Sequence, residues 1–327
     1  MKIYFVEWNA SYENLMIDSL KDKFEIIGLH KLTRHYNKIN KYLLKNNISN
    51  YWLSKIHAGI KLKKIKNEDL FICNGFSVLG IIDMVKTIEC NKILILRDTI
   101  EKLNHEMKIN KKWLRENEDY IARVKPHFSH IYSFDINDCK KYDLIYLPQF
   151  LPYQYNEMIK ISLKNKISSS SKSCYFIGMY NSHRQKVIEN VYTLMQKNYF
   201  DTNFHLIDKE KKAKNYPEFC KNIPLTYCEN IETLQKSDII LEINNISQEG
   251  ITLRSIECLI FNKKLITTNK AIKKSDFYHP NRIFILDEDD PLRIPSFLLN
   301  ESPPVENELL KKYSSDTMLE TILKNYK

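Results

Sequence analysis

Glycine is scarce in this sequence, and its few positions are therefore informative. Only six of the 327 residues are glycine. Three of them, Gly75, Gly178 and Gly250, each follow a run of residues typical of a strand. Glycine between a strand and a helix permits a tight turn and a close approach of the backbone to a ligand. We therefore expect turns of this kind at all three positions.

Paired cysteines and long apolar runs are also missing. The seven cysteines are scattered without a CxxC pair, which argues against a disulfide framework and against a metal site. No apolar run reaches the length of a membrane span. The first residues, MKIYFVEWNASYENL, lead directly into a strand and lack the layout of a signal peptide. We therefore expect a cytoplasmic protein.

Positive charge is plentiful, with a formal net charge of +10 that comes mostly from lysine. A basic surface suits nucleic acid or an anionic membrane. The lysine-rich segment 31–65, with aromatic residues at Tyr36, Tyr42, Tyr51 and Trp52, is a candidate for a surface that faces a membrane or an acceptor. An ordinary amphipathic helix in a lysine-rich protein explains the same pattern.

The chain alternates strand-like and helix-like segments throughout, which predicts an α/β fold. We expect two Rossmann-like domains that face each other across a cleft. Residues 1–150 form the first domain, and a linker, 151–173, contains the serine run 168–171. The second domain spans 174–302, and a final helix occupies 303–327 after Pro303 and Pro304.

The segment 238–269 has the most specific pattern in the chain. An apolar run, 239–243, and a short strand, 264–268, flank a polar turn and a helix that we expect to begin at about Ile251. Such a βαβ unit places the turn at the carboxyl end of a parallel strand, where open α/β sheets bind ligands. The free N–H groups at the start of the helix suit a phosphate.

Polar residues of this segment fall on one side of the expected helix. Gly250, Arg254 and Glu257 have the spacing of a shared face, and Glu249 and Glu257 form an E-x7-E pattern. An alternative is that Glu249 is an acid favoured at a helix start and that Arg254 and Glu257 form a solvated i,i+3 pair.

The run EGITLRSIECLIFNKKLITTN resembles the nucleotide-sugar-binding unit of GT-B glycosyltransferases, in particular those of bacterial lipopolysaccharide and capsule loci. The resemblance implies that Glu257 holds the ribose hydroxyls, that Gly250 and Thr252 face the diphosphate, and that Glu249 acts near the sugar. The same unit would include Ser247, Gln248 and Arg254.

Two further segments carry weaker signals. A strand at 174–177 precedes Gly178, Asn181 and Arg184 at a helix start, and the resemblance implies that these three residues approach the diphosphate. Asp98 follows the strand 92–96 and is a candidate catalytic residue, although Asp98 or Thr99 as a helix cap is the alternative. The motif SFDINDCKKY at 133–142 resembles an SFDxxDxxKY element of the same enzymes, although Asp135 and Asp138 also suit a turn and a cap.

These observations together favour a glycosyltransferase that moves a sugar from a nucleotide-sugar donor to a lipopolysaccharide or capsule glycan, free or lipid-linked. Because no DxD-type motif stands at a strand end, we expect no metal and no cofactor. The acidic run 287–290 has the pattern of a solvated loop. The alternatives are another two-Rossmann enzyme, such as a sugar-nucleotide epimerase, or a non-catalytic basic protein. A non-catalytic protein would bind an anionic membrane or a nucleic acid, but no nucleic-acid-binding signature is present.

Overall fold

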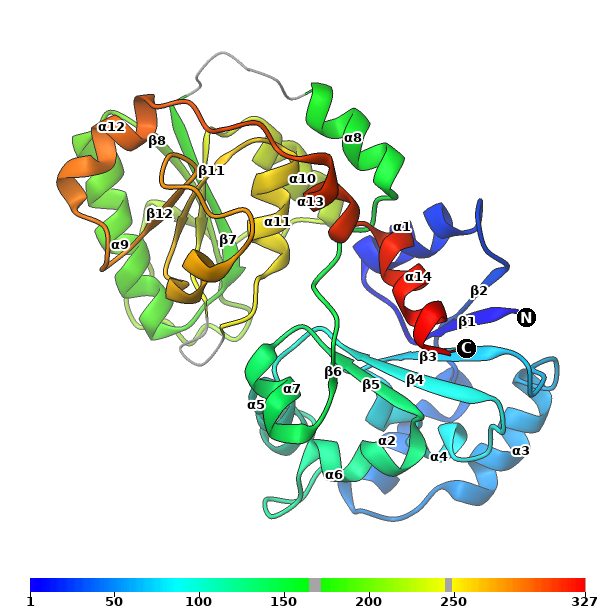
Figure 1. Cartoon of the computed structure of the whole chain (residues 1–327). Helices are drawn as coiled ribbons and strands as arrows, with labels where there is room; N and C mark the ends of the chain where they lie inside the picture. Colours follow the sequence, from blue (N-terminus) through cyan, green and yellow to red (C-terminus); the bar gives the residue numbers. More distant parts are fainter. Residues whose placement is uncertain (165–171, 245–248, 327) are drawn as a thin grey trace. The chain divides into compact units, whose positions relative to one another are not determined.

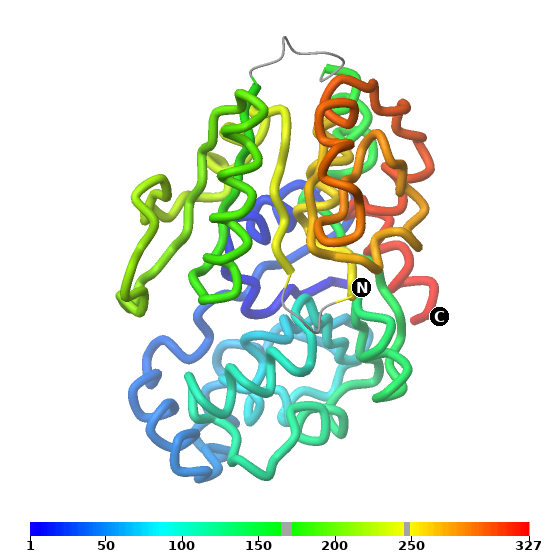
Figure 2. Tube along the Cα trace, turned by 90° about the vertical axis from the view of Figure 1, so that its left-hand side faces the viewer, coloured from blue at the N-terminus to red at the C-terminus, as the bar shows by residue number. Residues whose placement is uncertain are grey.

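The computed structural model describes residues 1–164, 172–244 and 249–326. The chain divides into two compact units, Met1–Tyr153 and Gln154–Lys327. In Figure 2 the trace of the first unit runs from blue to green, and that of the second from green to red. Each unit is a parallel sheet covered by helices.

The first unit contains a six-stranded sheet with the order β2-β1-β3-β4-β5-β6. All its pairings are parallel. Its strands are β1 (Ile3–Val6), β2 (Ile26–Leu29), β3 (Leu70–Asn74), β4 (Asn91–Leu96), β5 (His130–Ser133) and β6 (Ile145–Tyr146). From β1 the chain adds β2 on one side, and it then adds β3 on the other side of β1. The strand order therefore reverses between β1 and β3, and we call this point the change of direction of the sheet.

Helices cover both faces of this sheet (Figure 1), with α1 on one face and α2 to α4 and α6 on the other. The helices are α1 (Ser11–Leu20), α2 (Asn37–Lys45), α3 (Tyr51–Lys61), α4 (Ile82–Val85), α5 (Ile100–His105), α6 (Tyr120–Val124) and α7 (Ile136–Tyr142). Shorter turns are η1 (Arg34–Tyr36), η2 (Val78–Ile81), η3 (Glu106–Asn110) and η4 (Lys125–His127).

The second unit contains a parallel sheet with the order β12-β11-β10-β7-β8-β9. Counted from β7 this is 3-2-1-4-5-6, the doubly wound Rossmann order. Its strands are β7 (Ser173–Met179), β8 (Asp201–Ile207), β9 (Cys220–Lys221), β10 (Ile239–Glu242), β11 (Lys264–Thr267) and β12 (Ile283–Ile285). This sheet changes direction between β7 and β10.

Helices α9 and α12 lie on one face of the second sheet and α10 and α11 on the other (Figure 1). The helices are α8 (Tyr155–Lys164), α9 (Ser182–Lys197), α10 (Tyr227–Gln235), α11 (Leu253–Ile260), α12 (Ile294–Leu299), α13 (Asn307–Lys312) and α14 (Ser315–Tyr326). Two short turns are η5 (Lys270–Lys274) and η6 (Pro291–Arg293). No helix in the described ranges is both long enough and apolar enough to cross a membrane.

The structure corrects several expected elements. The stretch expected as a linker, 151–173, contains α8, and the expected final helix is divided into α13 and α14. The Thr226 hydroxyl caps α10.

Gly75 is required for a close approach of two strands. A Cβ at this position would lie 2.6 Å from Leu96 Cδ2 and 3.2 Å from the carbonyl oxygen of Ile95. Gly59, exposed in the last turn of α3, has no atom within 4 Å of such a Cβ. A methyl group therefore meets close contacts at Gly75 and open space at Gly59.

We predict that Gly75→Ala lowers the unfolding free energy of the first unit by about 1–3 kcal/mol, because the new methyl overpacks a backbone contact. Gly59→Ala should raise it by about 0.5–1 kcal/mol through helix propensity. Urea denaturation of both variants measures the two effects. Equal effects of the two substitutions would contradict the packing explanation.

Candidate functional site

The carboxyl ends of β7 and β10 meet where the second sheet changes direction. Ligands of open α/β sheets bind at this position. The predicted residues 178–184 lie at and after the end of β7, and 249–257 follow β10. The hydrogen bonds and ion pairs of these residues show which of them lie close together.

Arg184 joins the two strand ends. Its Nη1 donates to the carbonyl of Met179 at 2.8 Å, and its Nε donates to the carbonyl of Ile243 at 3.4 Å. Burial lowers the pKa of its guanidinium. Within the described part of the chain, Arg184 forms no ion pair with a carboxylate. A partly desolvated cation therefore lies at the change of direction of the sheet.

Asn181 fixes the start of α9. Its side-chain Oδ1 accepts from the backbone N–H of Arg184 at 2.7 Å, which is the contact of a helix N-cap. Asn181 thus positions Arg184 through the backbone. The sequence analysis assigned both residues to the diphosphate, which stays a prediction, and it did not foresee the cap.

Gly178 lies within β7 and does not form the expected turn. It pairs with Leu206 of β8, and the chain leaves the strand only after Met179. A Cβ at Gly178 would lie 2.8 Å from Phe176 Cζ. The glycine therefore makes room for the Phe176 ring, and the expectation of a glycine turn at this position is wrong.

Glu242 is a site residue that the sequence analysis missed. It ends β10 and is 4% exposed. Its carboxylate accepts from the hydroxyls of Ser255 at 2.7 Å, Thr267 at 2.6 Å and Thr252. The available signal was an acid in the otherwise apolar run IILEI, because a buried carboxylate requires hydrogen-bond donors.

Thr252 determines where α11 begins. Its Oγ1 accepts from the backbone N–H groups of Arg254 at 3.1 Å and Ser255 at 3.4 Å. The helix therefore starts at Leu253, two residues later than expected. Gly250 is buried but precedes the helix, so it does not share a helical face with Arg254 and Glu257.

Arg254 and Glu257 form a buried pair, with 2.7 Å between Nη1 and Oε2. Their side chains are 19% and 3% exposed, so the alternative of a solvated pair is wrong. Burial lowers the pKa of Arg254, but the charge of Glu257 and the smaller effects of Tyr175, Cys258 and Tyr227 raise it, and the net shift is upward. The guanidinium carbon also lies 6.0 Å from the centre of the Tyr175 ring.

The remaining residues of this loop are only partly described. Glu249 is exposed, and its carbonyl accepts from Asn269 Nδ2 at 3.4 Å. Ser247 and Gln248 lie outside the described residues. Glu249 therefore stays a prediction for the sugar end of the site, as do Ser247 and Gln248 for the loop.

Asp98, in the first unit, forms an i,i+4 ion pair with Lys102. Thr99 is the cap of α5, as one alternative proposed. Asp135 caps α7, and Asp138 accepts from the backbone N–H of Ile100 at 2.8 Å. The two acids of the SFDxxDxxKY element thus serve as a cap and an anchor between helices. Burial raises the pKa of Asp138.

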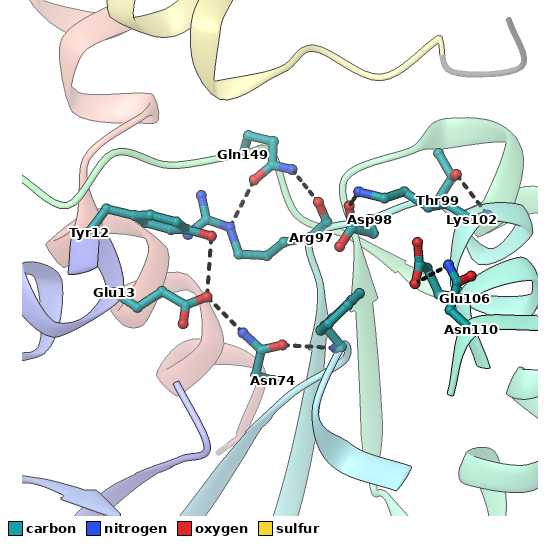
Figure 3. A network of polar contacts seen from close by, with 11 residues as sticks. Tyr12, Glu13, Asn74, Arg97, Asp98, Thr99, Lys102, Glu106, Asn110 and Gln149 are labelled. Carbon is teal, nitrogen blue, oxygen red and sulfur yellow. Dashed lines mark hydrogen bonds and ion pairs between the residues drawn. The ribbon is translucent and has the colours of Figure 1, made fainter. Parts of the chain in front are cut away.

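A second missed residue, Glu13, belongs to a polar network of the first unit (Figure 3). Glu13 accepts from Asn74 Nδ2 at 2.8 Å and from the hydroxyl of Tyr12 at 3.3 Å. Burial raises its pKa, against the opposing effects of the N–H of Ala10 and the charge of Arg97. The sequence offered no signal, because Glu13 looks like an ordinary acid in the first turn of a helix.

Arg97 lies beside Glu13 in the same network. Its Nε donates to Gln149 Oε1 at 3.0 Å and its Nη2 to the carbonyl of Phe150 at 2.9 Å. The guanidinium carbon lies 4.3 Å from the centre of the Phe150 ring and 5.0 Å from that of Tyr12. Partial burial raises the pKa of Tyr12 to about 12. The network connects polar side chains at the carboxyl ends of β3 and β4.

Metal ligands do not gather in the described ranges, where no three His, Cys, Asp or Glu residues have the arrangement of a metal site. In the acidic loop 287–290, Asp289 accepts from the backbone N–H of Ile285 at 2.7 Å and pairs with Arg293. Asp290 caps η6. These two acids therefore hold a turn together.

We predict that Glu257→Gln lowers the unfolding free energy of the second unit by roughly 1–3 kcal/mol, because Arg254 would stay buried without its counter-charge. Glu210→Gln is the matched control, since Glu210 pairs with Lys212 with side chains 70% and 64% exposed. Its effect should stay within about 0.5 kcal/mol. Urea denaturation measures both, and equal effects would refute the buried-pair assignment.

Comparison with known proteins begins with two negative results. No protein-family model matches the sequence, and no curated protein matches it. Solved structures do match over almost the whole chain.

One is an alpha-glucosyltransferase in complex with UDP and a 13-mer DNA containing a central A:G mismatch. It has a TM-score of 0.61 and 11% identity, over 99% of both chains. A UDP-forming alpha,alpha-trehalose-phosphate synthase from Burkholderia xenovorans, in complex with glucose-6-phosphate, has a TM-score of 0.58 and 8% identity over 99% of both chains.

A putative UDP-N-acetylglucosamine 2-epimerase from Listeria monocytogenes has a TM-score of 0.54 and 8% identity, over 100% of this chain and 96% of that one. At such low identities these likenesses show the fold alone. The predicted fold class is confirmed: the chain has two Rossmann-like units, each with a parallel sheet and flanking helices, as in GT-B glycosyltransferases.

Proposed function

We propose that this protein is a glycosyltransferase that takes a sugar from a nucleotide-sugar donor bound by the second unit. The observation that carries this proposal is Arg184, a partly buried cation bound to the carbonyls of Met179 and Ile243. Its position at the change of direction of the sheet is where a nucleotide diphosphate binds in this fold class. Neighbours with UDP in their descriptions support the same ligand.

The chemistry of transfer requires stabilisation of the departing diphosphate. Arg184 and the free N–H groups at the start of the 16-residue helix α9 supply positive charge near one point. Such preorganised charge stabilises a leaving group without reorganisation during the reaction. We therefore assign the diphosphate to this corner and propose that no metal is required.

We assign the ribose and the sugar to the neighbouring loop and helix. Glu257 would bind the ribose hydroxyls beside its ion pair with Arg254, and Glu249 would lie near the transferred sugar. Thr252 acts on this site indirectly, because its hydroxyl is bonded to Glu242 and its position sets the start of α11. For Asp98 the ion pair with Lys102 leaves the catalytic assignment a prediction.

The first test is turnover of a panel of nucleotide-sugars in the presence of excess chelator. Release of free nucleotide that depends on an added glycan acceptor is the expected result. Epimerised donor would instead identify an epimerase, and tight binding of an oligonucleotide without turnover would identify a basic binding protein. Activity that requires added magnesium or manganese would contradict metal independence.

The same preparation tests Arg184 through nucleotide binding. Arg184→Gln should weaken UDP binding about 10- to 100-fold, the scale of a lost charge-assisted hydrogen bond. Lys186→Gln, which changes an exposed cation of the same helix, is the control and should leave the affinity unchanged. Calorimetry that finds equal affinity for both variants would overturn the diphosphate assignment.

We further propose that the acceptor is a lipopolysaccharide or capsule glycan on a lipid and that the protein acts at the inner face of the cytoplasmic membrane. Helix α3 supports this, because Trp52, Ile56 and Ile60 are 74%, 64% and 64% exposed and share one face by their spacing of four. Lys55 Nζ lies 5.8 Å from the centre of the Trp52 ring. Exposed apolar residues among lysines are typical of a surface that lies on anionic lipid.

We predict that serine at Trp52, Ile56 and Ile60 together reduces binding to anionic vesicles by at least about tenfold, because each lost side chain removes roughly 1 kcal/mol of apolar burial. The control replaces Tyr199, Leu292 and Leu299, which are 87%, 86% and 85% exposed. Co-sedimentation at low and high salt measures the difference. Equal losses in both variants would refute a membrane face on α3.

A further inference from the structure

The first unit has a pocket of about 440 Å³ where its own sheet changes direction. Glu7, which follows β1, Lys31, which follows β2, and Ser77, which follows β3, all line it. Both Glu7 and Lys31 have a positive φ, of 58° and 53°. Non-glycine residues in this conformation are uncommon and often mark functional sites. The volume lies in the range of small-molecule sites.

Positive charge dominates the pocket. Its lining includes Lys31, Arg34, Lys41 and Lys111, and none of the four forms an ion pair in the described ranges. The single acid is Glu7, whose two carboxylate oxygens accept from the N–H of Leu32 at 2.6 Å and from Asn9 Nδ2 at 2.8 Å. The acid is thus held by its own neighbours, while four cations surround one cavity.

Lys111 is the cation that the fold holds most firmly. Its Nζ donates to the carbonyl of Phe76 at 2.9 Å, and it lies 3.8 Å from the centre of the Phe76 ring and 4.6 Å from that of Trp113. Burial lowers the pKa of Lys111 to about 8, Glu106 and Asp98 raise it, and Lys41 lowers it further. Lys41 is thus a second positive charge that acts on Lys111, in opposition to the carboxylates of Glu106 and Asp98.

Trp113 supplies an apolar wall beside these charges. A Cβ at Gly80 would lie 3.1 Å from Trp113 Cη2, so the glycine permits a close approach of the indole to the backbone. Both residues line the pocket. The combination of a rigid aromatic wall with several cations suits a ligand that is part sugar ring and part anion.

We propose that this pocket binds the acceptor and that the accepting sugar carries a phosphate group. A phosphate dianion would relieve the repulsion among Lys31, Arg34, Lys41 and Lys111 and would accept several charge-assisted hydrogen bonds. This inference names the acceptor class of the proposed glycosyltransferase and therefore rests on that function. It can nevertheless be tested by binding alone.

The experiment is calorimetric titration of the full chain, with and without UDP, by a hexose 6-phosphate, a hexuronate and the neutral hexose. The phosphate should bind at least tenfold more tightly than the other two. Lys111→Gln and Lys41→Gln should each weaken its binding about 10- to 100-fold. Lys64→Gln, an exposed lysine that does not line the pocket, should not.

The pH dependence provides a second readout. Only protonated Lys111 attracts the anion, and the phosphate is already a dianion above about pH 7. Its affinity should therefore fall as the pH rises from 7 to 9 through the pKa of Lys111, and Lys111→Gln should flatten this dependence. Because UDP is assigned to the second unit, urea denaturation checks in each variant that the first unit is still folded.

The inference would be overturned by equal binding of the neutral hexose, by no binding of the phosphate, or by losses in Lys64→Gln equal to those in Lys111→Gln. Tighter binding of the hexuronate would show that the pocket prefers a sugar with a carboxylate, and it would reject a phosphate group on the acceptor. UDP binding with no phosphate binding would reject this inference while leaving the donor assignment intact, whereas the absence of UDP binding would reject the donor site itself.

Discussion

The buried carboxylate of Glu242 is the interaction on which the second unit's ligand edge depends. It joins the end of β10 to the two elements that follow, because its hydroxyl partners come from the cap and first turn of α11 and from β11. A carboxylate at 4% exposure is tolerable only when such donors surround it. The start of α11, and with it the place of Arg254 and Glu257, follows from this bond set.

The two units use charge in different ways at equivalent positions. The second unit has one cation, Arg184, held by two carbonyls, together with an ion pair that neutralises itself in Arg254 and Glu257. The first unit has four cations around a cavity and a single acid engaged by its neighbours. Because a diphosphate needs two or three well-placed donors and a flexible acceptor needs a broader field, this difference matches a division into donor and acceptor halves.

Much of the fold could be predicted because its signals are local. The apolar runs predicted at 92–96 and 239–243 correspond to β4 and β10, and the pattern at 178–184 placed Arg184 beside a strand end. The failures concern packing across the sequence. Gly178 was expected in a turn, but it lies in β7, where the absence of a side chain leaves room for the Phe176 ring. Neither Glu13 nor Glu242 was found, because their importance comes from partners such as Asn74 and Thr267 that only the folded chain brings close.

The C-terminal helices have a consequence for dissecting the protein. The backbone N–H of Tyr155, at the beginning of α8, donates to Asp316 Oδ1 of α14 at 2.9 Å, so the first and last helices of the second unit fasten to each other. A shortened clone that stops near residue 302 would keep every strand of the second sheet and still leave α8 without its partner. Expression of the second unit alone should therefore include both ends of the segment 154–327. The contact between α8 and α14 joins these two ends, and the sheet does not replace it.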